Sequence, residues 1–232
     1  MKRDRPVIAI DGPVGAGKST AARALARALG FAYLNTGAMY RAVAIAARAA
    51  GIGPDDPDAP ERLDPVLKAI AIRFDGERIF LDSRDVTAEI TEPEIGDLAS
   101  RFSALAIVRA RMRDLQRAAG EGGGVVMEGR DIGTAVFPDA EFKFYLDAGI
   151  EVRAERRFAE LDAKGVKITP QEVLSQLIDR DRRDSGRELA PLRRASDAIA
   201  IDSTNMTIAA EVQAMKAEID RRFVAAKPLK RS

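Results

Sequence analysis

The sequence of 232 residues contains no cysteine and no histidine. Without cysteine there is no disulfide framework, thiolate zinc site, iron–sulfur cluster or cysteine nucleophile, and a reducing compartment is indicated. Without histidine there is no imidazole metal ligand and no Ser-His-Asp triad, and the side chain best suited to proton transfer near neutral pH is missing. Any chemistry must therefore use other groups.

Long apolar runs and a dominant charge are also missing. No stretch approaches the roughly 18 apolar residues that a membrane-spanning helix needs, and the charged residues 1–6 resemble neither a signal peptide nor a transit peptide. The 37 basic and 36 acidic residues leave a net charge of +1, which argues against a surface specialised for nucleic acid or anionic membrane. We expect a cytoplasmic enzyme with neither partner and, because no apolar surface stripe is evident, a monomer.

Arginine, by contrast, is abundant. The basic residues comprise 28 Arg and 9 Lys, and 15 of the arginines lie between Arg101 and Arg194. The planar guanidinium group binds phosphate and carboxylate groups through paired hydrogen bonds. This bias favours a protein that binds anionic ligands.

Five short apolar runs rich in β-forming residues alternate with helical patterns along the chain. They are Val7–Ile10, Phe31–Leu34, Val125–Met127, Phe142–Leu146 and Ala198–Ile201. The alternation predicts a parallel sheet covered by helices on both faces. In the last helix one apolar stripe is expected, made of Ile208, Val212, Met215, Ile219 and Phe223.

The alternation breaks between residues 51 and 90. A loop rich in proline and aspartate and a short helix lead to two apolar runs, Ile70–Phe74 and Arg78–Leu81, on either side of an Asp75-Gly76 turn. This arrangement predicts a small antiparallel insertion. Helical patterns then resume and continue to about residue 119.

The motif that carries chemistry follows the first predicted strand. It matches every fixed position of the P-loop signature and comprises Gly12, Pro13, Val14, Gly15, Ala16, Gly17, Lys18 and Ser19, with Thr20 next. Backbone N–H groups of such a loop surround phosphate oxygens at the positive end of the helix, while Lys18 reaches the transferable phosphate and Ser19 can hold Mg²⁺. The alternative is a glycine-rich turn without catalytic meaning, which the neighbouring strand, helix, lysine and serine disfavour.

A P-loop predicts a nucleoside triphosphate ligand but not the class of protein. GTPases usually read guanine with Asn or Thr followed by Lys-x-Asp, and no Asn or Thr in this chain precedes a lysine. A chain of this length also leaves little room for the further domains of a motor or transporter ATPase. A small-molecule kinase is favoured, and a nucleotide-binding regulatory module without transfer activity is the alternative from a different class.

Three further segments resemble bacterial cytidylate kinases. They are Asn35–Arg41, Glu128–Ala140 and Arg180–Leu192, and the resemblance spans nearly the whole chain. It implies an α/β fold of P-loop NTPase type, with a five-stranded parallel sheet, helices on both faces, a small antiparallel insertion in the monophosphate-binding region and a helical lid. The implied core comprises residues 1–52 and 93–226, with the lid at about 150–187, the insertion at 53–92 and a C-terminal tail at 227–232.

The resemblance also implies a reaction and its residues. The reaction is phosphoryl transfer from ATP, with Mg²⁺, to CMP or dCMP, and the runner-up is a kinase for another small acceptor such as UMP or a polyol. ATP is expected at the loop from Gly12 to Thr20, with the metal on Ser19. The implied CMP-binding residues are Thr36, Gly37, Tyr40, Arg41, Ser100, Arg109, Arg130, Asp131, Arg180, Asp184 and Arg187. The implied catalytic residues are Lys18, Arg130, Arg153, Arg157 and Arg187.

The cytosine ring gives a chemical check on part of this set. By resemblance, Ser100, Arg109 and Asp131 surround the base. Cytosine offers an amine donor beside a ring-nitrogen acceptor and a carbonyl acceptor, so a carboxylate and a guanidinium match it. Uracil inverts two of these groups, and Asp131 would then face a carbonyl oxygen. The set therefore predicts a preference for CMP over UMP.

Several of these side chains also have ordinary structural interpretations. Arg41 and Ser100 could be solvated residues on helix surfaces, and Arg130 beside Asp131 could be a local ion pair. Glu128 is either a carboxylate near the metal or a plain acid at a strand end.

Two helices are expected within the predicted lid. Arg156 and Glu160 have the spacing of an i,i+4 ion pair on a solvated helix face. Thr169-Pro170-Gln171-Glu172 predicts a helix start with a capping box. On that helix Arg180, Asp184 and Arg187 share one face if the helix continues far enough.

Overall fold

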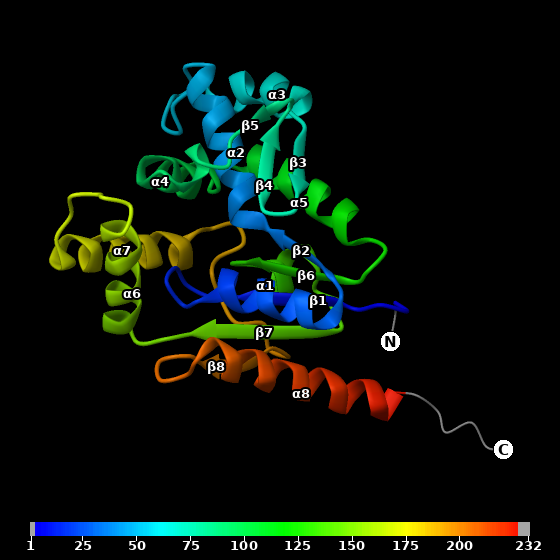
Figure 1. Cartoon of the computed structure of the whole chain (residues 1–232). Helices are drawn as coiled ribbons and strands as arrows, with labels where there is room; N and C mark the ends of the chain where they lie inside the picture. The colour runs from blue at the N-terminus through cyan, green and yellow to red at the C-terminus, as the bar shows by residue number, and fades with distance from the viewer. Residues whose placement is uncertain (1–2, 227–232) are drawn as a thin grey trace. The chain divides into compact units, whose positions relative to one another are not determined.

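The computed structural model describes residues 3–226, with side chains through Arg222, so the predicted tail at 227–232 lies outside the described residues. The strands are β1 Val7–Asp11, β2 Ala32–Asn35, β3 Ile72–Asp75, β4 Arg78–Leu81, β5 Arg84–Asp85, β6 Val125–Gly129, β7 Phe142–Asp147 and β8 Ile199–Asp202. The helices are α1 Lys18–Leu29, α2 Thr36–Ala49, α3 Ala59–Ala69, α4 Pro93–Phe102, α5 Ala106–Gly120, α6 Ile150–Asp162, α7 Pro170–Gly186 and α8 Ile208–Ala226, with short turns η1 Glu89–Thr91 and η2 Ile132–Val136 (Figure 1). The chain forms two compact units, Met1–Leu34 with Gly120–Ser232 and Asn35–Ala119.

The first unit is built on a five-stranded sheet with strand order β2-β6-β1-β7-β8. β1 pairs in parallel with β6 and β7, and β7 pairs in parallel with β8. β1 and β6 are buried along their whole length, as strands covered on both faces are. All five predicted strands are confirmed, because a contiguous apolar run encodes each of them.

Helices α1 and α8 pack against each other and contribute to the core of this sheet (Figure 1). Leu25 of α1 and Met215 and Ile219 of α8 lie in one buried cluster with Phe144 of β7. The predicted stripe of the last helix therefore faces inward at its centre, while the side chain of Phe223 lies outside the described set.

A separate helical pair, α6 and α7, follows β7. Its buried core consists of Ala154, Leu161, Val173 and Leu177. The predicted capping box starts α7: Thr169 Oγ1 accepts from the Glu172 amide at 3.2 Å, and Glu172 Oε2 accepts from the Thr169 amide at 2.7 Å. The box satisfies N-terminal amide groups that the helix itself leaves without partners.

The second unit contains α2 to α5 and a three-stranded sheet of order β3-β4-β5. β3 and β4 form the predicted antiparallel pair around the Asp75-Gly76 turn, with Phe74 opposite Ile79. β5 was not expected, because two polar residues give no strand pattern. The helical region after residue 93 is divided into α4 and α5 by a short turn at Ser103–Leu105.

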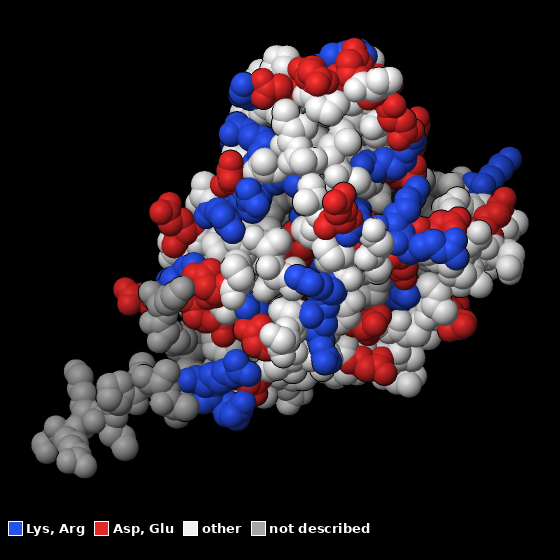
Figure 2. All heavy atoms as spheres, turned by 180° about the vertical axis from the view of Figure 1, so that it is seen from behind, with Lys and Arg blue, Asp and Glu red and all other residues white. Residues whose placement is uncertain are grey.

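The balanced charge of the sequence is also visible on the surface. On the face shown in Figure 2, basic and acidic side chains are interspersed among neutral ones. Within residues 3–226, no helix combines the length and the apolar character needed to cross a bilayer.

Candidate active site

The loop between β1 and α1 depends on glycine at its first position. Gly12 has φ +151°, and a Cβ there would lie 1.9 Å from the Leu146 carbonyl oxygen of β7. Only glycine allows the chain to leave β1 this close to the neighbouring strand. At the other end of the loop, Gly17 occupies the N-cap of α1 in the left-handed region, and the first turn of α1 contains no acidic residue. The amide groups and positive end of the helix therefore remain suited to an anion.

Lys18 begins α1 and is buried. Its Nζ donates to the Pro13 carbonyl oxygen at 2.6 Å. Burial lowers the pKa of Lys18 to about 7, and Arg130 and Arg180 push in the same direction, while Glu128 and Asp11 oppose the shift. The Lys18 amino group is thus held against the P-loop backbone, and both basic and acidic side chains act on its pKa.

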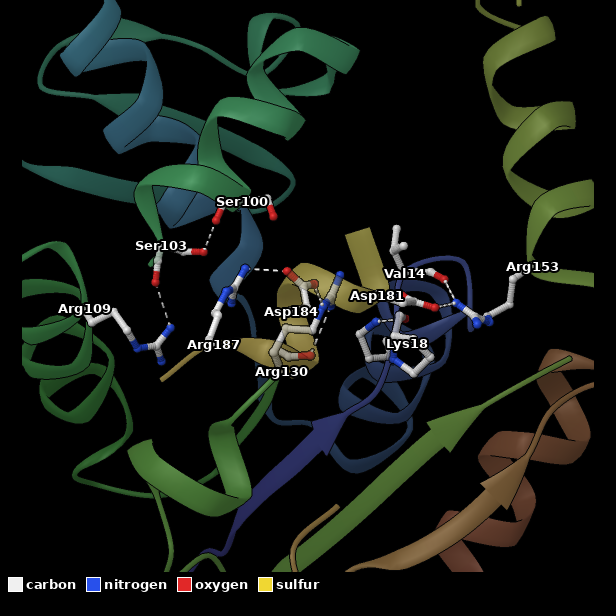
Figure 3. A network of polar contacts seen from close by, with 12 residues as sticks. Val14, Lys18, Ser100, Ser103, Arg109, Arg130, Arg153, Asp181, Asp184 and Arg187 are labelled. Carbon is white, nitrogen blue, oxygen red and sulfur yellow. Dashed lines mark hydrogen bonds and ion pairs between the residues drawn. The ribbon is translucent and has the colours of Figure 1, made fainter. Parts of the chain in front are cut away.

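Arg153 connects the loop to the α6–α7 pair. Its guanidinium donates to the Val14 carbonyl oxygen at 3.1 Å and to Asp181 of α7 at 2.6 Å (Figure 3). The Val14 side chain also packs on the buried cluster between α6 and α7. Arg153, one of the predicted catalytic residues, is therefore buried and hydrogen-bonded to the P-loop backbone.

A second charged cluster joins the end of β6 to the last turn of α7. Arg130 Nε donates to Asp184 Oδ2 at 3.0 Å, and Arg187 donates to Asp184 Oδ1 (Figure 3). Burial opposes ionisation of Asp184, but Arg130, Arg187 and Arg180 together hold its pKa below the usual range. Three predicted arginines and the predicted aspartate thus come together, so the end of α7 presents cationic groups around one buried carboxylate.

Asp11 belongs to this region, although it was not among the predicted residues. Its carboxylate accepts the amide of Ile132 at 2.9 Å and that of Gly133 at 2.7 Å. Burial raises the pKa of Asp11 to about 7, partly offset by the two amides, and the charge of Asp131 adds to the rise. Asp11 therefore fixes η2, the turn that directly follows Asp131. The available signal was an acid at the end of a fully apolar strand.

The remaining predicted residues lie in the second unit. Asn35 caps α2 by accepting from the Ala38 amide at 3.0 Å; the first turns of α2 carry the predicted residues Thr36, Gly37, Tyr40 and Arg41.

Ser100 and Arg109 lie on α4 and α5 of the same unit. The guanidinium of Arg109 lies 5.8 Å from the centroid of the Tyr40 ring and donates to the Ser103 carbonyl oxygen at 3.3 Å. Ser103 Oγ in turn donates to the Ser100 carbonyl oxygen at 2.7 Å (Figure 3). Ser100 is buried, so the interpretation as an ordinary surface serine is wrong.

The predicted ion pair between Arg156 and Glu160 is also wrong. Arg156 donates instead to Ser203, and Glu160 accepts from Arg157 at 2.8 Å and from Lys164 at 2.9 Å. Burial opposes the ionisation of Glu160, but these two cations hold its pKa below the usual value. The helix spacing allowed either pairing, and only the tertiary position of Ser203 decides between them.

No group of three or more Asp or Glu side chains within residues 3–226 has the arrangement of a metal site. Tyr33 donates to Glu128 Oε1 at 2.6 Å, and the nearby Ser19 side chain acts to lower the pKa of Tyr33. Burial and the charge of Glu128 raise the pKa of Tyr33, which keeps its hydroxyl protonated. Mg²⁺ usually takes few protein ligands together with substrate phosphates, so the Ser19 hydroxyl at a phosphate loop fits this ion.

Comparison with known proteins gives consistent matches over most of the chain. The family model described as Cytidylate kinase matches residues 8–221. The Cytidylate kinase of Citrifermentans bemidjiense is 47% identical over 225 residues, which cover 96% of each chain. That of Thermotoga neapolitana is 43% identical and covers 94% of this chain and 98% of its own.

A solved structure supports the fold alone. The crystal structure of an uncharacterized protein from Eubacterium ventriosum matches with a TM-score of 0.51 at 14% identity, covering 94% of this chain and all of the other.

Proposed function

Because the chain belongs to the cytidylate kinase family, we propose that it transfers the terminal phosphoryl group of ATP to CMP or dCMP, giving CDP or dCDP and ADP. The observation that carries this proposal is the P-loop with buried Lys18 in the same unit as the cluster of Arg130, Asp184 and Arg187. One feature binds a triphosphate, and the other offers cations to phosphate groups.

The chemistry explains why histidine is not needed. The acceptor is a phosphate oxygen that is already anionic, so no side chain has to remove a proton from it. Catalysis requires instead that two mutually repelling anions are aligned and that charge on the transferring group is neutralised. Lys18 and the arginines supply this charge without any proton transfer.

Each predicted residue receives a role in this proposal. Lys18 and the loop amides hold the ATP phosphates, and Arg130, Arg153, Arg157 and Arg187 act on the transferring phosphoryl group. Arg41 binds the acceptor phosphate, with Thr36, Gly37 and Tyr40 around it, and Arg180 and Asp184 hold the ribose. Ser100, Arg109 and Asp131 read the cytosine. The helical pair α6–α7 is the lid that excludes water, because ATP hydrolysis competes with transfer.

Ser19 is the residue that would hold Mg²⁺, with Tyr33 and its partner Glu128 close to the Ser19 side chain. When bound, the ion neutralises phosphate charge and keeps the triphosphate in a fixed conformation. Thr20 follows on α1 and completes the ATP-binding segment. The protein acts as a monomer on free nucleotides in the cytoplasm, which agrees with its lack of cysteine.

A coupled assay of ADP formation tests the function. Purified protein with ATP and Mg²⁺ is supplied with CMP, dCMP, UMP or a polyol, and the products are identified by chromatography. We expect CDP and dCDP as the main products. Faster turnover of UMP or a polyol contradicts the acceptor assignment, and ATP binding without transfer to any acceptor supports a regulatory module instead.

A further inference from the structure

Two buried side chains and one partly buried arginine, all outside the predicted site, meet next to the P-loop. Ser203 lies in the turn between β8 and α8, Arg156 on α6 and Glu211 in the first turn of α8. Ser203 and Glu211 have no solvent-accessible surface. We call this group the Ser203 brace.

The hydrogen bonds of Ser203 run directly to the loop backbone. Ser203 Oγ donates to the Ala16 carbonyl oxygen at 3.1 Å. Arg156 donates twice to Ser203, from Nη1 to Oγ at 3.2 Å and from Nη2 to the carbonyl oxygen at 2.8 Å. The Ser203 amide donates to the Asp147 carbonyl oxygen at 2.7 Å. With every polar group of Ser203 engaged, the hydroxyl has one orientation, and it points to Ala16.

Glu211 faces the same point from α8. A Cβ placed on Gly17 would lie 3.8 and 3.9 Å from the two carboxylate oxygens of Glu211 and 4.0 Å from Arg156 Nη1. Within the described residues, neither carboxylate oxygen has a hydrogen-bond partner. Burial raises the pKa of Glu211, and attraction from Arg156 opposes the rise. The charge of Arg156 thus offsets part of the cost of burying this carboxylate, and the attraction draws the guanidinium group toward Gly17 and Ser203.

Peptide geometry connects this group to phosphate binding. In a trans peptide the C=O and the following N–H point in opposite directions. A hydroxyl that holds the Ala16 carbonyl outward therefore turns the Gly17 N–H toward the inner side of the loop. The Val14 carbonyl is held in the same way by Arg153, which orients the Gly15 N–H.

We propose that Ser203, held by Arg156 and Glu211, is a positioning residue for the P-loop and keeps the Gly17 amide aimed at the phosphates of ATP. The inference rests on the proposed function only in taking ATP as the ligand of the loop. It assigns β8, α6 and α8 a part in triphosphate binding. These elements act through the backbone of the P-loop and need not touch the nucleotide.

The test compares Ser203→Ala with a matched substitution in the same connection between β8 and α8. Thr207 Oγ1 accepts from the Ala210 amide at 3.2 Å, a hydrogen bond at the start of α8 and not to the loop, so Thr207→Ala also removes one hydroxyl and one hydrogen bond. We expect Ser203→Ala to weaken ATP binding and to raise the KM for ATP by about three- to tenfold, the effect of one lost hydrogen bond. The KM for CMP should change less than twofold, and Thr207→Ala should leave both constants near wild type. Ser203→Thr, which keeps the hydroxyl, should restore ATP binding.

A double-mutant cycle tests the part played by Arg156. Arg156→Lys cannot make both bonds to Ser203, so it should weaken ATP binding, and adding Ser203→Ala should bring little further loss. Additive losses contradict this coupling.

Unchanged ATP binding by folded Ser203→Ala, or equal changes in the constants for ATP and CMP, overturns the inference. Direct calorimetric titration with ATP tests the Ser203 inference without any acceptor. Protein that binds ATP but makes no CDP would refute the proposed function, and the comparison of ATP binding by wild type and Ser203→Ala would still decide the inference.

Discussion

Lys18 is the first residue of α1, and its Nζ donates to the Pro13 carbonyl oxygen of the P-loop. Its replacement by alanine should remove charge neutralisation on the transferring group while leaving the loop backbone in place. We expect Lys18→Ala to lower kcat by about 10³-fold or more with an unchanged circular dichroism spectrum. Lys216→Ala is the matched control, because Lys216 lies on the exposed side of α8 and pairs only with Asp220 in the described structure. Activity retained by Lys18→Ala would count heavily against the mechanism.

The pKa of Lys18 gives a prediction about protons. At a pKa of about 7, much of the free protein carries neutral lysine at pH 8, whereas lysine bound to phosphate is charged. ATP binding at pH 8 should therefore take up close to one proton, and affinity should fall between pH 7 and pH 9 by up to about tenfold per unit. Calorimetry in two buffers with different protonation enthalpies measures this uptake. Lys18→Arg keeps its charge throughout, so the same uptake in that variant would contradict the assignment.

Asp131 is the residue expected to discriminate between pyrimidines. It is buried at the start of η2, so a carboxylate that faced a uracil carbonyl there would oppose two acceptors away from solvent. Asp131→Asn supplies a donor to that carbonyl, so the ratio of kcat/KM for CMP to that for UMP should fall by about tenfold or more. Competition kinetics with both nucleotides gives the ratio. If the variant discriminates as wild type does, another residue reads the base.

Among the structural elements, β1 and α1 depend on the passage through Gly12. Any Cβ there would overlap the Leu146 carbonyl oxygen and would also occupy an unfavourable φ. Gly12→Ala should therefore cost about 3 kcal/mol or more of unfolding free energy. Gly30→Ala, at the end of α1, has a positive φ but no atom within 4 Å, and should cost about 1 kcal/mol. Urea denaturation of both variants separates the clash from the conformational cost, and equal losses would show that the approach to β7 is unimportant.

How far each element could be predicted depended on how local its signal is. The P-loop, the five strands and the Thr169 capping box are each encoded within a few residues, so pattern and structure agree. Asp11 acts on Ile132 and Gly133, more than 120 positions away, and Arg156 acts on Ser203, 47 positions away. Such contacts leave no periodicity in the chain. They arise because parallel strands bring the ends of distant segments to one edge of the sheet.

For the whole molecule, ligand binding should appear as stability. A ligand that binds only the native state at 100 times its dissociation constant adds about 2.7 kcal/mol, which for a chain of this size corresponds to a rise in Tm of roughly 5–10 °C. Thermal denaturation with ATP and Mg²⁺ should show this rise in wild type and a much smaller one in Lys18→Ala. A rise of equal size in the variant would place the triphosphate away from the P-loop.

The strand order also has a consequence for biosynthesis. β1 is made first, but its two neighbours in the sheet begin only at Val125 and Phe142. The segment 35–119, in contrast, forms a compact unit from one continuous stretch. On the ribosome that stretch can fold early. The apolar strand β1 (Val7–Asp11), in contrast, cannot pair until more than a hundred further residues have been synthesised. A stalled or truncated nascent chain would expose this strand, and it would be the natural place for a chaperone to bind.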